Sequence, residues 1–232
     1  RRRENTPEDI MRRMLSILGF SGLMLAASPG GTHPHVFVTG GAHFGVNADG
    51  ELDRLHISWI YDVYASLYLL SYVNADKDGD GKFTADEKER VLADQTAWPD
   101  DFAGDSYLYL SGERQQIGKP VNSDTRILED GRVEVMFERM LAKPFRPGTD
   151  EDPAAVVKLY DPTFYYAYEV TAAPEVRGPE GHGCTAEHKP YDPEAPGLAA
   201  LKTELAALGR DETPDQQDVG ALFADDLILS CD

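Results

Sequence analysis

The chain has 232 residues, of which 41% are hydrophobic, so it is long enough to bury the core of one domain. Acidic residues outnumber basic ones by 41 to 22, which gives a formal net charge of −19. This charge repels nucleic-acid phosphates and anionic lipid head groups, so we expect no nucleic-acid partner. It is typical either of a surface that attracts cations or of an acidic surface that only keeps the protein soluble.

Residues 1–32 have the pattern of a leader. Arg12 and Arg13 precede a short apolar stretch, Leu15–Ala27, that ends in small residues, as in a signal peptide. We therefore expect a protein secreted to the periplasm. The stretch is shorter than the roughly 18 residues that cross a bilayer, and no later stretch reaches that length, so no membrane span is expected in the mature chain. An uncleaved N-terminal anchor is the alternative.

The predicted domain, residues 33–232, begins with a β-hairpin. Apolar and β-branched residues fill 35–46 and 52–60, and Asn47-Ala48-Asp49-Gly50 between them supplies a tight turn. Two helices are then predicted at 62–75 and 85–97, on either side of an acidic loop.

The second half of the chain has mainly strand patterns. Strands are predicted at 106–110, 132–137, 155–160 and 164–170, followed by an irregular proline-rich loop at 172–197, a short amphipathic helix at 198–208 and a last strand at 223–231. We therefore predict one α+β domain, mainly antiparallel β, with an inserted helix-loop-helix at 62–97 and a short C-terminal helix.

Cys184 and Cys231 are the two cysteines, and an oxidising compartment would pair them in a disulfide bond. Free buried thiols are the alternative.

The acidic loop matches the twelve-residue EF-hand template, Asp76-Lys77-Asp78-Gly79-Asp80-Gly81-Lys82-Phe83-Thr84-Ala85-Asp86-Glu87. Calcium takes six to eight oxygen ligands, which alternate positions of such a loop supply. The predicted ligands are the carboxylates of Asp76, Asp78, Asp80 and Glu87, the backbone carbonyl of Lys82, and Thr84 directly or through water. Because no second loop has this spacing, we expect weak affinity, with a Kd of roughly 10⁻⁴ to 10⁻³ M.

Histidines are concentrated near the start of the predicted domain. His33 and His35 flank Pro34, and His43 lies farther along the same predicted strand. Imidazole is a good ligand for nickel, cobalt, copper and zinc, so we predict a transition-metal site at these three residues. Ordinary surface or half-buried histidines are an equally weighted alternative, because the spacing matches no strict ligand pattern.

The segments His33-Pro34-His35-Val36-Phe37-Val38, Trp59-Ile60-Tyr61-Asp62 and Tyr160-Asp161-Pro162-Thr163-Phe164-Tyr165, together with the acidic loop, resemble the exported bacterial family called domain of unknown function 1007. Members are often described beside nickel/cobalt exporters, so the resemblance implies metal handling, with a membrane metal transporter as partner. We therefore expect a periplasmic calcium-binding accessory of a nickel, cobalt or zinc transport system. A calcium-stabilised structural or protein-interaction module is the alternative. No enzyme is expected, because no catalytic motif is recognisable.

Overall fold

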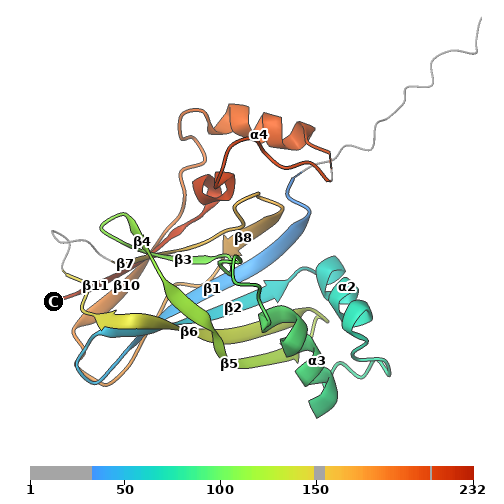
Figure 1. Ribbon diagram of the computed structural model, residues 1–232, viewed down its shortest axis with the longest axis horizontal. Coiled ribbons are helices and arrows are strands. Elements are labelled where there is room, and N and C mark those ends of the chain that lie inside the picture. Colours follow the sequence, from blue (N-terminus) through green and yellow to red (C-terminus); the bar gives the residue numbers. More distant parts are fainter. Residues whose placement is uncertain (1–32, 149–154, 210) are drawn as a thin grey trace, which may run out of the picture. The chain divides into compact units, whose positions relative to one another are not determined.

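The computed structural model describes residues 33–148, 155–209 and 211–232, and one compact unit spans Gly31–Asp232. The predicted leader, residues 1–32, lies outside the described residues. The described chain is mostly β-sheet, with strands in two sheets and three α-helices (Figure 1). Within these ranges, no helix has both the length and the apolar character needed to cross a membrane.

The first sheet contains the predicted hairpin. Its strand order is β5-β6-β2-β1-β8. The short β9 pairs with the C-terminal part of β1, on from the residues that pair with β8. The hairpin strands pair antiparallel, and His43 lies opposite His56. Strands β8 and β9 instead run parallel to β1. The bounds of the strands are β1 Val36–Val46, β2 Leu52–Tyr61, β5 Ile117–Ile127, β6 Val133–Phe145, β8 Tyr166–Val170 and β9 Val176–Arg177.

The second sheet has the order β10-β11-β7-β3-β4, and all its neighbours are antiparallel. The prediction of a mainly antiparallel α+β fold is therefore confirmed. The bounds are β3 Ser106–Leu110, β4 Glu113–Gln115, β7 Ala155–Leu159, β10 Cys184–Lys189 and β11 Asp226–Cys231.

The two sheets share one hydrophobic core. Alternate residues of β2 are buried, as expected for a strand with one face on a core, and they join buried residues of β7 and β11. Gly40 lies where β1 approaches β7: a Cβ atom there would lie 2.8 Å from Cδ1 of Leu159. Glycine therefore permits a close contact between the layers at this point.

The helices are α2 Val63–Val73, α3 Ala85–Thr96 and α4 Leu198–Ala207, and a 3₁₀ turn, η1, spans Val219–Phe223. Asp62 begins α2: one carboxylate oxygen accepts the N–H of Ala65 at 2.9 Å, and the other accepts the N–H of Phe37 on β1 at 2.9 Å. The buried hydroxyl of Ser66 donates to the Tyr61 carbonyl at 3.2 Å and accepts the Val133 N–H at 2.9 Å. These contacts fix the first turn of α2 on the first sheet.

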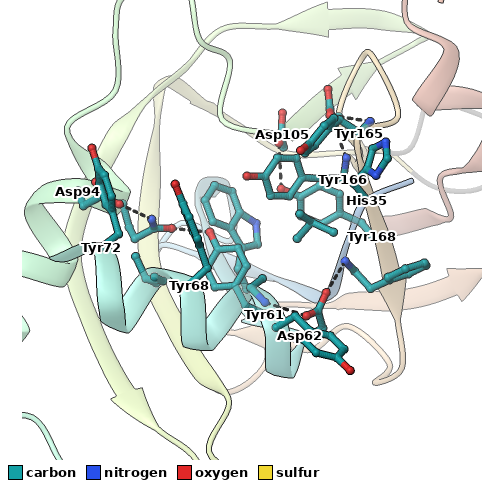
Figure 2. Close-up of a pocket in the computed structure, with 18 of the residues that line it drawn as sticks. His35, Tyr61, Asp62, Tyr68, Tyr72, Asp94, Asp105, Tyr165, Tyr166 and Tyr168 are labelled. Carbon is teal, nitrogen blue, oxygen red and sulfur yellow. Dashed lines mark hydrogen bonds between the residues drawn. The ribbon is translucent and has the colours of Figure 1, made fainter. Parts of the chain in front are cut away.

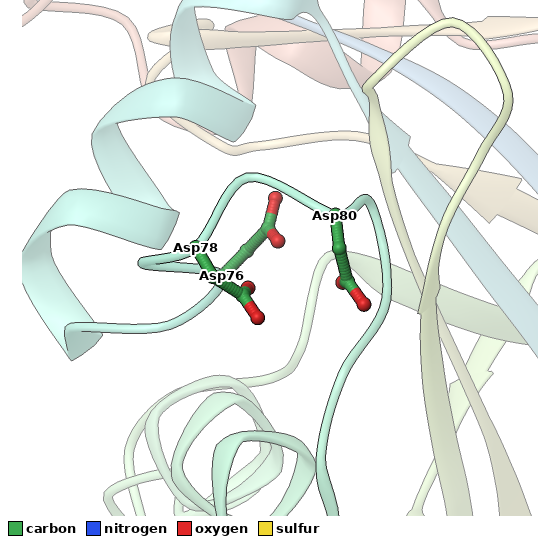
Figure 3. A group of neighbouring side chains, drawn as sticks. All are labelled: Asp76, Asp78 and Asp80. Atoms are coloured by element: carbon green, nitrogen blue, oxygen red, sulfur yellow. The ribbon is translucent and has the colours of Figure 1, made fainter.

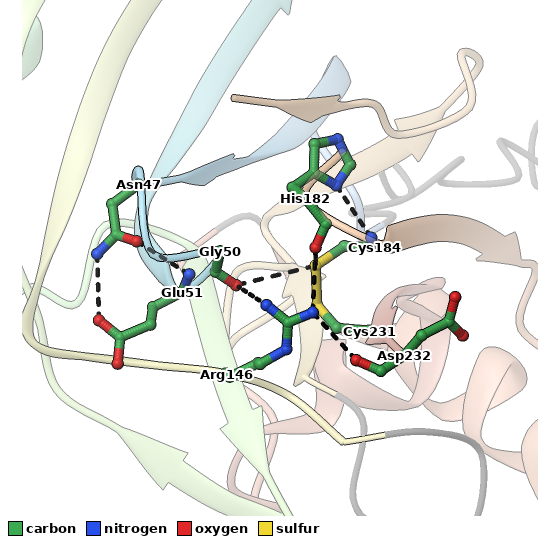
Figure 4. The surroundings of a disulfide bond; sticks show 8 residues. All are labelled: Asn47, Gly50, Glu51, Arg146, His182, Cys184, Cys231 and Asp232. Atoms are coloured by element: carbon green, nitrogen blue, oxygen red, sulfur yellow. Dashed lines mark hydrogen bonds between the residues drawn. A yellow bond between two sulfur atoms is a disulfide. The ribbon is translucent and has the colours of Figure 1, made fainter. Parts of the chain in front are cut away.

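A disulfide bond joins Cys184 on β10 to Cys231 on β11, as predicted, where the two residues lie opposite each other (Figure 4). The Arg146 guanidinium beside it donates to three backbone carbonyls, those of Gly50 at 3.2 Å, His182 at 3.1 Å and Asp232 at 3.0 Å. The hairpin turn, the loop before β10 and the C-terminus are thereby held together.

Several elements differ from the prediction: the short strands β4 and β9 were not predicted, and β6 is longer than the predicted strand 132–137. The strand β5 was not predicted, because Gly118, Pro120 and Asn122 interrupt its pattern, and its pairing with β6 shifts register twice around them. The strands β9 and β10 both lie inside the segment 172–197, which was predicted to be irregular. The last strand begins at Asp226 because the preceding residues form η1, whose Phe223 packs with α4.

Candidate metal centre and the histidine residues

The acidic loop joins α2 to α3. At the end of α2, Asn74 adopts the left-handed conformation, with φ 62°, and the N–H that caps the helix donates to the Leu70 carbonyl. Arg90 of α3 reaches back and donates to the carbonyls of Val73 at 3.0 Å and Asn74 at 2.9 Å. The guanidinium thus provides hydrogen bonds to carbonyls at the C-terminal end of α2 and holds the start of the loop beside α3.

Three aspartate side chains of the loop converge, as Figure 3 shows. Asp76, Asp78 and Asp80 each offer one carboxylate oxygen, and these oxygens lie within 4.8 Å of one another. Two oxygens bound to one calcium ion at about 2.4 Å can be no more than about 5 Å apart. The three carboxylates therefore already have the spacing that a shared calcium ion requires.

Backbone hydrogen bonds hold these carboxylates in place. Oδ1 of Asp76 accepts the N–H of Gly81 at 3.1 Å, and Oδ1 of Asp80 accepts the N–H of Lys82 at 2.9 Å. Gly79 and Gly81 have φ angles of 68° and 73°, which residues with a Cβ adopt reluctantly. The loop therefore folds back on its own first carboxylate.

Glu87 lies in the first turn of α3 and forms a capping box with Thr84. Its Oε2 accepts the backbone N–H of Thr84 at 2.9 Å and the Thr84 hydroxyl at 2.8 Å. These bonds lower the pKa of the Glu87 carboxyl, and the backbone N–H of Asp76 lowers it further. The last predicted ligand of the loop is therefore close to the first.

His33 and His35 lie together at the start of β1. Their ring centroids are 4.9 Å apart, and the ring of Tyr165 packs against both, at 5.8 Å and 4.9 Å. The N–H of His35 donates to the carbonyl of Tyr165 at 2.8 Å, because β8 continues parallel to β1 from this point. His33 is buried.

His43 does not join them. It lies eight residues farther along an extended strand, which corresponds to about 25 Å, and its Nδ1 accepts the N–H of Glu175 at 3.0 Å. Burial, with a further contribution from Arg177, lowers its pKa. Within β1 and the residues just before it, His43 thus lies far from His33 and His35, because residues on the same face of an extended segment can be far apart. Within the described ranges, the groups of three or more possible metal ligands comprise only the three loop aspartates.

A family model described as "protein of unknown function (DUF1007)" matches residues 19–231, which is most of the chain. The chain belongs to the DUF1007 family. The resemblance seen in the sequence is thereby confirmed as to family. No curated protein matches the chain.

Among the residues of this DUF1007 chain that the sequence did not point to, Asp105 is notable for its chemistry. It is buried directly before β3, and its Oδ2 accepts the hydroxyl of Tyr168 at 2.9 Å. Burial, and next the neighbouring carboxyl of Asp161, raise the pKa of Asp105 to about 7. The segment Asp105-Ser106 carries no recognisable motif, so only the folded structure brings this carboxyl to attention.

Proposed function

We propose that this protein is an exported calcium-binding protein whose loop Asp76–Glu87 holds one ion in the manner of an EF-hand. The observation that carries the proposal is the 4.8 Å grouping of the Asp76, Asp78 and Asp80 carboxylates in a loop of the correct length between two helices. Their mutual repulsion is relieved by a divalent cation. Glu87, the carbonyl of Lys82 and Thr84 complete the proposed ligand set.

Calcium would act here mainly as a structural ion. The loop follows α2, whose first turn Ser66 holds on the sheet, and it precedes α3, which packs on β5. Lys88, where EF-hand helices usually carry an apolar residue, instead pairs with Asp124 of β5. A bound ion would therefore fix the two helices to each other and to the edge of the first sheet. The disulfide supports an oxidising, periplasmic location.

Apart from binding calcium, the protein would act as a calcium-stabilised structural or protein-interaction module. The separation of His43 from His33 and His35 favours this role over a three-histidine site for nickel, cobalt, copper or zinc. The family does not name a transported metal. A membrane metal transporter remains a proposed partner on the family resemblance alone.

Calorimetric titration of the disulfide-bonded protein with calcium tests the proposal. We expect one site per chain with a Kd of roughly 10⁻⁴ to 10⁻³ M. Asp76→Asn should abolish the binding heat, because the first loop position supplies a charged ligand oxygen. Asp101→Asn removes the same charge from an exposed residue outside the loop and should bind calcium as the parent does. Equal binding by both variants would exclude this loop as the site.

A further inference from the structure

A pocket of about 990 Å³ opens between α2, the C-terminal end of α3 and the first sheet (Figure 2). Its walls come from β1, β2 and β8, from α2, and from the segment 97–105. The residues that line it lie outside the proposed calcium loop, so it constitutes a second candidate site.

Half of the residues that line the pocket are phenylalanine, tyrosine or tryptophan. Trp59 and Trp98 stack with their centroids 5.7 Å apart, and Tyr68 and Tyr72 stack at 6.0 Å on α2. Both tyrosines are strongly exposed, at 71% and 68%. Gly104 lets Trp98 pack closely, since a Cβ there would lie 2.2 Å from the indole. Ring faces carry negative electrostatic potential, so such a lining attracts cations.

The charged groups that line the pocket all have the same sign. Four carboxyl side chains face it, those of Asp62, Asp94, Asp105 and Asp161, whereas no lysine or arginine is among the described lining residues. No ion pair involves any of the four within the described ranges. The Arg139 guanidinium lies over the ring of Trp98 at 5.2 Å and donates to the backbone carbonyls of Ala103, Ser106, Ile117 and Gly118.

Two buried polar atoms of the lining have no hydrogen-bond partner among the described residues. They are Oδ1 of Asp105, a residue only 6% exposed, and Nε1 of Trp59, a residue only 3% exposed. A buried polar group without a partner costs free energy.

We propose that this pocket binds an organic ammonium cation, either quaternary or a protonated amine. A large, weakly hydrated cation gains from contact with ring faces, whereas calcium requires a shell of oxygen ligands that aromatic rings cannot replace. The aspartate carboxyls provide charge complementarity to a cation. The proposal is independent of calcium binding by the loop.

The Asp105 carboxyl gives the proposal a pH dependence. Its pKa is raised to about 7 by burial and Asp161, against the lowering influence of the Tyr168 hydroxyl and Arg139. The other titratable side chains that interact with it are Tyr61, Tyr107 and Tyr166. Since the ionised carboxylate attracts a cation, binding of a permanently charged ligand should tighten as pH rises through 7. We expect at least about a threefold lower Kd at pH 8.5 than at pH 5.5.

The test is NMR or calorimetric titration with two pairs of probes: choline against its neutral isostere 3,3-dimethylbutan-1-ol, and 2-phenylethylammonium against 2-phenylethanol. We expect at least one cation to bind at least about tenfold more tightly than its neutral partner. Tyr68→Ala should weaken that binding at least about fivefold, since the stacked ring is lost. Leu67→Ala removes another strongly exposed side chain of α2, one that does not line the pocket, and should leave the cation's Kd unchanged.

Asp105→Asn should remove the pH dependence. If a pH dependence persists in this variant, a group other than Asp105 would be its source. That outcome would overturn the role given to Asp105. Three results would overturn the proposal itself. The neutral probes could bind as tightly as the cations, or no cation could bind at up to 10 mM, which corresponds to a binding free energy of about −2.7 kcal/mol. The third is an equal loss of cation affinity in Tyr68→Ala and Leu67→Ala. Tyr68 is exposed, so its variant remains informative if Asp105→Asn does not fold.

Discussion

Loss of the disulfide between Cys184 and Cys231 is expected to lower the free energy of unfolding by roughly 4 kcal/mol. The two residues are 47 positions apart, so the bond removes considerable conformational freedom from the unfolded chain. The double variant Cys184→Ala/Cys231→Ala, compared with the oxidised parent in urea unfolding, measures the effect. Alanine is chosen because both cysteines are buried and a serine hydroxyl would add a desolvation cost.

Arg146 provides the control for this experiment. Its guanidinium lies beside the disulfide and holds residues next to both cysteines, His182 and Asp232, but only through hydrogen bonds to their carbonyls. Arg146→Lys should therefore destabilise the oxidised protein much less than the double alanine variant. A loss below about 1 kcal/mol in the double variant would contradict the view that this bond is a main constraint on the C-terminal strand.

Calcium at 10 mM is expected to raise the free energy of unfolding by about 1.4 to 2.7 kcal/mol, the range that a Kd of about 10⁻³ to 10⁻⁴ M produces when the ion binds only the folded chain. Glu87→Gln should abolish this gain. The amide oxygen can still accept from Thr84, so the capping box survives while a charged calcium ligand is lost.

The matched control is Asp86→Asn, an exposed substitution in the same helical turn. It removes one negative charge near the loop without removing a proposed ligand, so its calcium response should equal that of the parent. Thermal or urea unfolding with and without calcium measures both variants. If Glu87→Gln keeps the full gain in free energy, Glu87 does not bind the ion.

Local sequence signals were sufficient to predict the hairpin and the arrangement of the carboxylates in the acidic loop. Asp49-Gly50 between two alternating segments predicted the pairing of β1 with β2, which the structure confirms. The loop's carboxylates, glycines and flanking helices are set by residues close together in sequence, so their convergence at Asp76, Asp78 and Asp80 was also predictable. Such features depend on turn geometry and helix capping rather than on tertiary contacts.

Features that depend on distant contacts could not be predicted. The parallel pairing of β8 with β1 brings Tyr165 onto His35, although the two are far apart in sequence. The aromatic pocket needs α2, β2 and β8 at once, and the tyrosines of α2 gave only a helical pattern without indicating which face is exposed. The same reasoning applies to His43, His33 and His35: the sequence pattern indicated the face of the strand, not the distance between the residues.

The most direct test of calcium binding by the loop is the backbone amide resonance of Gly81 in a calcium titration followed by NMR. Its N–H donates to Oδ1 of Asp76, so an ion bound to that carboxylate should change the hydrogen bond and shift the resonance. Gly112 and Gly131 are matched controls, since both are exposed glycines with positive φ in turns outside the loop. We predict a shift of Gly81 that saturates at one calcium per chain, with Gly112 and Gly131 unchanged. A Gly81 resonance that stays in place at 10 mM calcium would contradict the proposed site.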